Sequence, residues 1–234
     1  MWKKRLFFLL LAGVVLWPLA GEEVLPADAQ ADLPVQVKYI ALTFDDGPRR
    51  GTTEKLLDGL RERGASATFF LVGEGIAGNE DLVERMAAEG HQVGNHTWSH
   101  VRLGGAPAAE AGHEVRRTQE ALEEILGEGD YWLRPPYGIV DEGMAAGVPM
   151  VKWSVDPRDW ESRNTAQVVR AVLRDAGPND IILLHDIYPS SVDAALQIVD
   201  ALQEEGYWFV TVEELLRLNG ITPQPGVMYR SGNG

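Results

Sequence analysis

Strand-like and helix-like segments alternate about seven times along this chain of 234 residues, which constrains its fold more than any other feature. The strand-like segments are short and mostly apolar, and the helix-like ones carry apolar residues at helical spacing. The expected strands span residues 39–44, 66–72, 92–94, 131–133, 150–155, 180–184 and 208–212. The pattern predicts an α/β domain with a parallel sheet, either closed as a barrel or open and doubly wound.

Polar side chains follow most of these strands, at positions that packing does not explain. They are Asp45 and Asp46, Asn95 and His96, Arg134, Asp156 and Asp159, and His185. In a (β/α) barrel the chemistry takes place at the C-terminal ends of the strands. The placement therefore favours a barrel, with a site built from several strand ends.

Two adjacent carboxylates, Asp45 and Asp46, end the first strand and precede the chain-turning pair Gly47-Pro48. Desolvating an unpaired carboxylate costs several kcal/mol. We therefore expect a cation or a hydrogen-bond network beside them. The alternative is an ordinary turn, because Asp-Gly and Gly-Pro are common turn sequences.

Two histidines, His96 and His100, stand four residues apart. If the segment forms a helical turn, both rings lie on one face and can bind a single ion. A carboxylate from a neighbouring strand end would complete the ligand number of a catalytic zinc site. The chain has no cysteine, so any metal must be held by His, Asp or Glu. The alternative is a pair of exposed or hydrogen-bonded core histidines.

Arg134 and Tyr137 flank two prolines on a stiff segment. The prolines can hold the guanidinium in a fixed direction, although a surface ion pair is the simpler explanation for a lone arginine. Tyr137 can simply pack against its neighbours. Its backbone N–H, presented by a rigid loop, would alternatively stabilise an oxyanion.

His185 ends an otherwise apolar strand, and Asp159 and Trp160 follow the strand that contains Trp153. A buried imidazole near a carboxylate has the tunable proton affinity that a general acid needs. A core histidine with satisfied hydrogen bonds is the alternative. The tryptophans are either core residues or the wall of a site for a sugar ring or an acetyl methyl group.

Five motifs in order resemble those of the polysaccharide deacetylase family, which shares the NodB homology domain and is also called carbohydrate esterase family 4. They are TFDDGP from Thr43, HTWSH from His96, RPPY from Arg134, DPRDW from Asp156 and LLHD from Leu183. The similarity covers the chain from about Val37 to Leu218. It implies a single distorted (β/α) barrel of about seven strands and metal-dependent removal of acetyl groups from N-acetylated sugars.

The resemblance also implies a role for individual residues. Asp46, His96 and His100 are implied to bind the metal, and Asp45 is implied to be the general base. Arg134 orients Asp45, the Tyr137 amide contributes to an oxyanion hole, and Asp159 tunes His185 as the general acid. Trp160, Leu183 and Pro136 are implied to contact the substrate. One divalent ion is expected, with zinc as the default and cobalt, nickel or manganese as alternatives.

The first 36 residues differ in composition from the rest. Residues 1–20 have a basic start and an apolar stretch, which predicts an export signal or an uncleaved N-terminal anchor. Residues 21–36 have the composition of a flexible leader, and residues 219–234 that of a loose C-terminal tail after a catalytic domain at 37–218. We therefore expect an exported protein, secreted or associated with the cell envelope.

The composition also limits the partners. A formal net charge of -14 argues against nucleic acid and anionic lipid surfaces, so a membrane is expected only through an uncleaved N-terminal segment. The expected substrate is an acetylated polysaccharide, with N-acetylglucosamine units of peptidoglycan or chitin-type chains as the first choice. O-acetyl xylan within the same family, and a non-catalytic carbohydrate-binding envelope protein, remain the alternatives.

Overall fold

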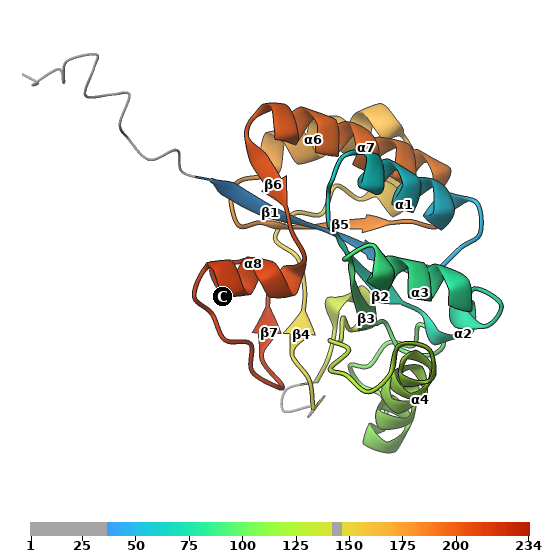
Figure 1. Ribbon diagram of the computed structural model, residues 1–234. Coiled ribbons are helices and arrows are strands. Elements are labelled where there is room, and N and C mark those ends of the chain that lie inside the picture. The colour runs from blue at the N-terminus through green and yellow to red at the C-terminus, as the bar shows by residue number, and fades with distance from the viewer. Residues whose placement is uncertain (1–36, 142–146) are drawn as a thin grey trace, which may run out of the picture. The chain divides into compact units, whose positions relative to one another are not determined.

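The computed structural model describes residues 37–141 and 147–234, and within them helices and strands alternate as predicted (Figure 1). The strands are β1 (Lys38–Asp45), β2 (Thr68–Leu71), β3 (Gln92–Asn95), β4 (Met150–Val151), β5 (Ile181–His185), β6 (Tyr207–Phe209) and β7 (Met228–Tyr229). The helices are α1 (Thr52–Glu62), α2 (Gly73–Ile76), α3 (Glu80–Ala88), α4 (Ala108–Leu126), α5 (Asp159–Ser162), α6 (Thr165–Asp175), α7 (Pro189–Glu204) and α8 (Val212–Leu218), with a 3-10 turn at Pro136–Gly138. The predicted α/β class is confirmed.

Strand β1 lies at the centre of a parallel sheet. The sheet has the order β3-β2-β1-β5, and β6 pairs with the N-terminal part of β1. The register places Asp45, the last residue of β1, beside His185 of β5 and Phe70 of β2. Because parallel strands end at the same edge, two of the predicted site residues are neighbours through backbone pairing alone.

The rest of the ring is irregular. Isolated parallel bridges join Asn95 to Leu133, Leu133 to Met150, and Val155 to Ile182, and so connect β3 back to β5. The expected strands at 131–133 and 150–155 are thus reduced to single bridges and the two-residue β4. Prolines 135, 136, 149 and 157 flank these segments and lack the N–H groups that a longer ladder needs. The predicted barrel is therefore distorted on this side.

Alternate residues of β1 face two different cores. Ile40, Leu42 and Phe44 are buried in the cluster that the sheet forms with α1, α3, α6 and α7. Ala41 belongs instead to a second cluster inside the ring, together with Phe70 and with Leu215 of α8. Full burial of an isoleucine, leucine or phenylalanine side chain contributes about 1.5–3 kcal/mol to the free energy of folding. Because side chains alternate between the two faces of a strand, Thr43 and Asp45 share the inward face of β1 with Ala41.

A glycine-rich run after β2, Gly73–Gly78, has the G-x-G-x-x-G spacing that is typical of dinucleotide-binding loops. Here it forms only the four-residue helix α2. A Cβ atom on Gly73 would lie 2.4 Å from the Trp98 ring and 2.7 Å from Thr118 Oγ1. Close packing explains this glycine, and the run does not support a nucleotide site.

The C-terminal tail is not loose as expected. Met228–Tyr229 forms β7, which pairs in parallel with β4, and Tyr229 is 5% exposed within the inner core. The Tyr229 hydroxyl also accepts a hydrogen bond from the Gln224 N–H at 3.0 Å. Proline and glycine gave the tail the composition of a mobile segment, but burial of one aromatic ring holds it in place.

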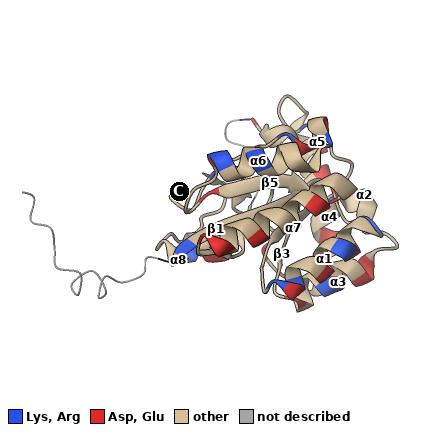
Figure 2. Cartoon of the chain, turned by 90° about the horizontal axis from the view of Figure 1, so that it is seen from above, with Lys and Arg blue, Asp and Glu red and all other residues tan. Residues whose placement is uncertain are grey.

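The predicted export segment (residues 1–20) and leader (21–36) lie outside the described residues. Within the described part of the chain, no helix is both long and apolar enough to cross a membrane. Both acidic and basic residues lie on α1 and α3 (Figure 2), where Arg85 pairs with Asp58 and Arg61 with Glu89. Such exposed pairs contribute about 0–1 kcal/mol each, so they favour solubility more than stability.

We predict that Tyr229→Ala lowers the free energy of unfolding by about 3 kcal/mol or more, because it removes a buried ring and leaves a cavity. Urea denaturation monitored by circular dichroism would measure the change. Val227→Ala is the matched control, because Val227 is 43% exposed, and it is expected to cost less than about 0.5 kcal/mol. Equal stability of the two variants would contradict a structural role for the tail.

Candidate metal-dependent active site

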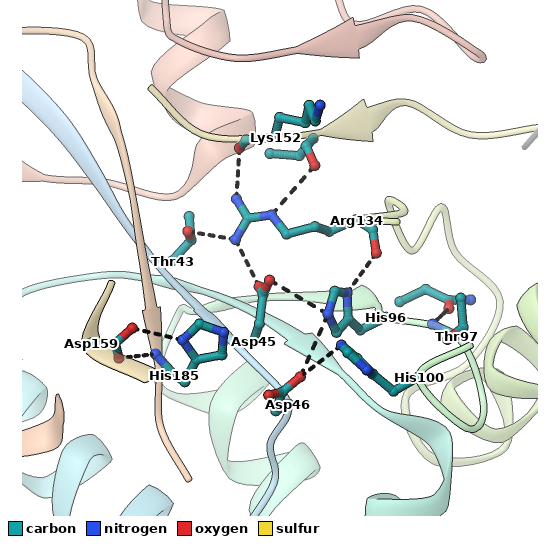
Figure 3. Close-up of polar contacts among 12 residues, drawn as sticks. Thr43, Asp45, Asp46, His96, Thr97, His100, Arg134, Lys152, Asp159 and His185 are labelled. Atoms are coloured by element: carbon teal, nitrogen blue, oxygen red, sulfur yellow. Dashed lines mark hydrogen bonds and ion pairs between the residues drawn. The ribbon is translucent and has the colours of Figure 1, made fainter. Parts of the chain in front are cut away.

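The predicted site residues converge at the C-terminal ends of the strands (Figure 3). Asp45 ends β1, His185 ends β5, and His96 follows β3 directly. In Figure 3 the carboxylates of Asp45 and Asp46 lie between His185 on one side and the pair His96 and His100 on the other. These groups open on a cavity of about 360 Å³, within the size range of small-molecule sites.

Asp46, His96 and His100 bring three potential metal ligands together. Their ligand atoms all lie within 4.8 Å of one another. Asp46 Oδ1 is 3.4 Å from His100 Nε2 and 3.7 Å from His96 Nε2. The expected helical turn is wrong, because Thr97 and His100 have φ angles of 65° and 58° and the segment is not helical. A left-handed loop, not helical spacing, sets the two rings 5.0 Å apart.

The hydrogen bonds around this cluster fit a cation. His96 Nδ1 donates to the Arg134 carbonyl at 2.6 Å, which leaves Nε2 with a lone pair that faces the carboxylates. Asp46 Oδ1 is buried and has no hydrogen-bond partner among the described residues. A lone pair and an unpartnered carboxylate oxygen repel each other unless a proton or a cation lies between them. Two imidazoles and one carboxylate are also the donors of catalytic zinc sites.

The protonation of His96 suits a ligand. Burial lowers its pKa below the ordinary value of 6.5, although Asp45 and Asp46 act in the opposite direction. His96 is therefore neutral at pH 7. Metal ions bind neutral imidazole, so no proton has to be removed before His96 can coordinate.

Asp45 forms a buried ion pair with Arg134. Arg134 Nη1 donates to Asp45 Oδ1 at 2.8 Å, and both side chains are almost fully buried. Burial alone would raise the pKa of Asp45, but the charge and hydrogen bond of Arg134, with further attraction from His96 and His185, hold it below its ordinary value. Asp45 is therefore ionised at neutral pH. Its Oδ2 lies 3.6 Å from His96 Nε2, on the side of the potential metal ligands.

Arg134 is fully buried and all of its nitrogens are hydrogen-bonded. Nη1 also donates to Thr43 Oγ1 at 2.7 Å, Nη2 to the Lys152 carbonyl at 2.8 Å, and Nε to the Val151 carbonyl at 3.4 Å. The guanidinium stacks on the Phe70 ring at 4.1 Å. These contacts exclude the surface ion pair that was the simpler explanation for this residue. They fix its direction through partners on β1, β2 and β4.

His185 is paired with a buried carboxylate. Its Nδ1 lies 2.8 Å from Asp159 Oδ1, and its backbone N–H donates to Asp159 Oδ2 at 2.9 Å. Burial alone would lower the pKa of His185, but the hydrogen bond and charge of Asp159, with Asp45 and Asp46, raise it to about 9. His185 is thus an imidazolium at neutral pH. This protonated pair stabilises the fold below pH 6.5, and the contribution is lost as the pH rises through about 9.

Tyr137 lies at the edge of the cavity with a left-handed backbone. Its φ angle is 60°, its ring contacts His100 at 4.9 Å, and its amide donates no hydrogen bond within the described residues. That N–H is therefore available to a ligand. Pro136, expected to contact the substrate, is instead buried and is not part of the cavity lining.

Aromatic side chains dominate the remaining wall of the cavity. The full lining consists of Asp45, Asp46, His96, His100, Tyr137, Trp153, Asp156, Trp160, Leu183, His185 and Tyr188. The sequence interpretation did not select Tyr188 or Thr43. Tyr188 could have been found from its place just after His185 in the loop that leaves β5. Thr43 could have been found because it shares the inward face of β1 with Asp45.

Asp186 was also overlooked. It is fully buried, and the Thr53 hydroxyl donates to its Oδ2. Burial raises its pKa to about 7. A Cβ atom on Gly47 would lie 2.5 Å from both carboxylate oxygens, so only glycine fits here. Asp186 therefore packs against the turn that follows Asp46.

Left-handed residues are concentrated around the cavity. Within the described residues, the non-glycine positions with positive φ are Asp46, Thr97, His100, Tyr137, Arg158, Arg163 and Asn179. Three of these line the cavity. Each such residue costs of order 1–3 kcal/mol, and clusters of them are common at active sites.

The sequence profile of the polysaccharide deacetylase family matches residues 32–149. The chain belongs to the polysaccharide deacetylase family. It is 40% identical over 195 residues to the peptidoglycan-N-acetylmuramic acid deacetylase PdaC of Bacillus subtilis (strain 168), covering 82% of this chain and 42% of PdaC. It is also 40% identical over 180 residues to the peptidoglycan-N-acetylglucosamine deacetylase PgdA of Listeria monocytogenes, covering 76% of this chain and 39% of PgdA. The match thus spans less than half of each relative.

Solved structures of the family share the fold. The structure of Bacillus subtilis PdaC has a TM-score of 0.77 with 40% identity, and the match covers 79% of this chain and 93% of that one. A family 4 acetyl xylan esterase from Clostridium thermocellum, in complex with a cobalt ion, has a TM-score of 0.78 with 31% identity, covering 83% and 98%. The distorted barrel predicted from the motifs is therefore the fold of this chain.

We predict that Arg134→Leu lowers the free energy of unfolding by about 3–5 kcal/mol, because it leaves Asp45 as an unpaired buried charge. Urea denaturation at pH 7 would measure the loss. The Asp45 pKa is lowered in the folded protein, so the pair stabilises the wild type above about pH 4 and the effect disappears as the pH falls below that value. The gap between variant and wild type should therefore narrow in acid. A gap that stayed constant with pH would contradict the ion-pair explanation.

Proposed function

We propose that this protein is a metal-dependent N-deacetylase of polysaccharides, acting on N-acetylglucosamine units of peptidoglycan or chitin-type chains. The observation that carries the proposal is the shared cavity of three groups: the cluster Asp46, His96 and His100, the ionised Asp45, and the protonated His185. A metal site, a base and an acid around one cavity are the components that amide hydrolysis requires. The names of PdaC and PgdA support the substrate class.

Asp46, His96 and His100 would hold one divalent ion, with zinc as our first choice. When bound, such an ion supplies Lewis-acid chemistry, lowering the pKa of a water ligand and polarising the acetyl carbonyl. Cobalt, nickel and manganese remain alternatives, and the cobalt in the Clostridium thermocellum esterase supports a site that accepts more than one metal.

Asp45 would be the general base. Arg134 occupies Oδ1 and keeps the carboxylate ionised, so Oδ2 remains available to accept a proton from the attacking water. The water oxygen then bonds to the carbonyl carbon, and negative charge develops on the carbonyl oxygen. The Tyr137 N–H, which has no acceptor among the described residues, would donate to that oxygen and stabilise the charge.

His185 would be the general acid. Asp159 accepts the hydrogen bond from Nδ1, which leaves the Nε2 proton for the leaving nitrogen. When the C–N bond breaks, the nitrogen takes this proton and departs as a free amine, and the carbonyl carbon departs as acetate. Trp160 and Leu183, both in the cavity lining, would contact the acetyl methyl group. Pro136 is buried, so it is not exposed enough to contact the substrate.

We also propose that the protein is exported to the cell envelope or secreted. The basic and apolar start of the chain supports export, and the peptidoglycan named for PdaC and PgdA lies outside the cytoplasmic membrane. An N-terminal segment that is not cleaved would tether the domain to that membrane. Acetylxylan is the competing substrate, because an acetyl xylan esterase shares the fold.

We predict acetate release from N-acetylglucosamine oligomers or peptidoglycan strands, and its loss on chelation with recovery after a divalent metal is added back. Asp45→Asn should reduce kcat by about 10²–10⁴-fold at unchanged metal content, because it removes the base but keeps the shape of the side chain. Acetate release from a panel that includes acetylxylan, with metal content measured on the same samples, would test this. Activity that survived complete chelation would contradict the metal site, and acetate from acetylxylan alone would reassign the substrate.

We predict that kcat falls as the pH rises through the pKa of His185, about 9, because the protonated form of His185 is the acid. A bound cation lowers this pKa, so the alkaline limb of the pH profile of kcat should lie at or below that value. Asp159→Asn removes the main stabilising partner and should move the limb towards the ordinary histidine pKa of about 6.5. The pH profile of kcat measures this, with Asp156→Asn as the control. An unchanged limb in Asp159→Asn would exclude His185 as the acid.

A further inference from the structure

Two arginines hold the loop between β5 and α7, directly after His185. Arg163 stacks on the Tyr188 ring at 3.4 Å, and its Nε donates to the Trp160 carbonyl at 2.7 Å. Arg49, three residues after Asp46, donates from Nη1 to the Ile187 carbonyl at 3.2 Å. Each guanidinium is therefore fixed by one nitrogen, while its other nitrogens remain available.

Neither arginine forms an ion pair within the described residues, although the protein is strongly acidic. Two acidic residues on the neighbouring helices α5 and α7 already have partners: Glu161 pairs with Arg158 at 2.9 Å, and Asp193 pairs with Lys55. Asp186, at the base of the same loop, is buried and bonded to Thr53. Two exposed guanidinium groups, which contact the consecutive residues Ile187 and Tyr188, thus have no acidic partner in the described part of the chain.

The 16-residue helix α7 begins at the same loop. Its first residue is Pro189, and Tyr188 at the N-cap gives no side-chain cap. The N-terminus of a helix carries a partial positive charge, which adds to that of the two arginines. Three sources of positive potential therefore meet at this edge of a protein whose formal net charge is -14.

This positive edge adjoins the cavity. Tyr188 and Trp160 both line the cavity. Arg163 contacts the ring of Tyr188 and the backbone carbonyl of Trp160. The Tyr188 ring lies 6.2 Å from that of His185. A carboxylate on the substrate would be attracted to this edge, whereas an unsubstituted chain carries no such charge.

We infer that Arg49 and Arg163 form a carboxylate-binding subsite that makes this enzyme prefer glycans with acidic substituents over neutral N-acetylglucosamine chains. The inference rests on the proposed deacetylase activity and narrows its substrate. The acidic group is a carboxylate linked to the glycan, either the lactyl group of the neighbouring sugar or the stem peptide attached to it. Guanidinium groups bind carboxylates through paired, charge-assisted hydrogen bonds.

The experiment compares N-acetylated chitotetraose, which is neutral, with peptidoglycan strands that retain their stem peptides and strands from which the peptides have been removed. Arg49→Gln and Arg163→Gln should each raise KM for carboxylate-bearing strands by about fivefold, and the double variant should raise it further. Values for kcat, and all constants for chitotetraose, should stay within about twofold. Arg158→Gln is the matched control, because this neighbouring arginine already has Glu161 as a partner.

Salt provides a second readout. The preference of the wild type for acidic strands should weaken as ionic strength rises, and the double variant should show little salt dependence. The lactyl carboxylate is free only in strands without peptides, because in intact strands it forms the amide bond to the peptide. A preference confined to peptide-free strands therefore assigns the carboxylate to the lactyl group, and one confined to intact strands assigns it to the peptide. A preference seen with both kinds of strand shows that either carboxylate occupies the subsite. Equal losses on neutral and acidic substrates, or no loss on either, would overturn the subsite.

Binding separates this inference from the proposed function. If the wild type releases no acetate from any glycan, the deacetylase proposal fails and the subsite is judged by affinity. Tryptophan fluorescence can report binding, because Trp153 and Trp160 line the cavity. A disaccharide with a lactyl carboxylate should bind more tightly than chitobiose, and the double variant should lose that difference. Equal affinities in the wild type would overturn the subsite independently of activity.

Discussion

The buried ion pair between Arg134 and Asp45 is the interaction on which the rest of the site depends. Removing two charges from water is costly, and a buried pair is tolerated only when its remaining hydrogen bonds are satisfied. Here Thr43 and the Lys152 and Val151 carbonyls satisfy the guanidinium, and Phe70 covers its face. The barrel interior is therefore built around a charge, and the irregular side of the ring supplies the carbonyls that make this possible.

Arg134 acts through its backbone as well as its side chain. The guanidinium orients Asp45, while the carbonyl of the same residue accepts the hydrogen bond from His96 Nδ1. One residue thereby sets the direction of the proposed base and the tautomer of a proposed metal ligand. Pro135 follows it directly and limits its backbone conformations. The metal cluster and the base are consequently held in a common frame.

Local patterns in the sequence predicted the strands that form continuous ladders and the strand ends that carry the site. The period of β1, with Thr43 and Asp45 on one face and Leu42 and Phe44 on the other, is readable because each face meets a different core. The helical turn at His96 was wrong because positive φ at Thr97 leaves no simple trace in a sequence.

Long-range contacts could not be predicted in the same way. Tyr229 stands in a segment rich in glycine and proline, and only its pairing with β4, almost eighty residues earlier, buries it. The contacts of Arg163 with Tyr188 and of Arg49 with Ile187 likewise join segments that are distant in sequence. Composition describes a segment by itself, whereas these positions are decided by what the rest of the chain places beside them.

The left-handed residues around the cavity have a consequence for how such a protein changes under selection. Glycine adopts their backbone angles without penalty, so replacing Asp46, His100 or Tyr137 by glycine would relieve local strain while deleting a side chain at the cavity. A library of variants screened only for heat resistance would therefore accumulate glycines at these positions. Its most stable variants would fold but lack activity, so a second screen for turnover would be needed to retain the enzyme's function.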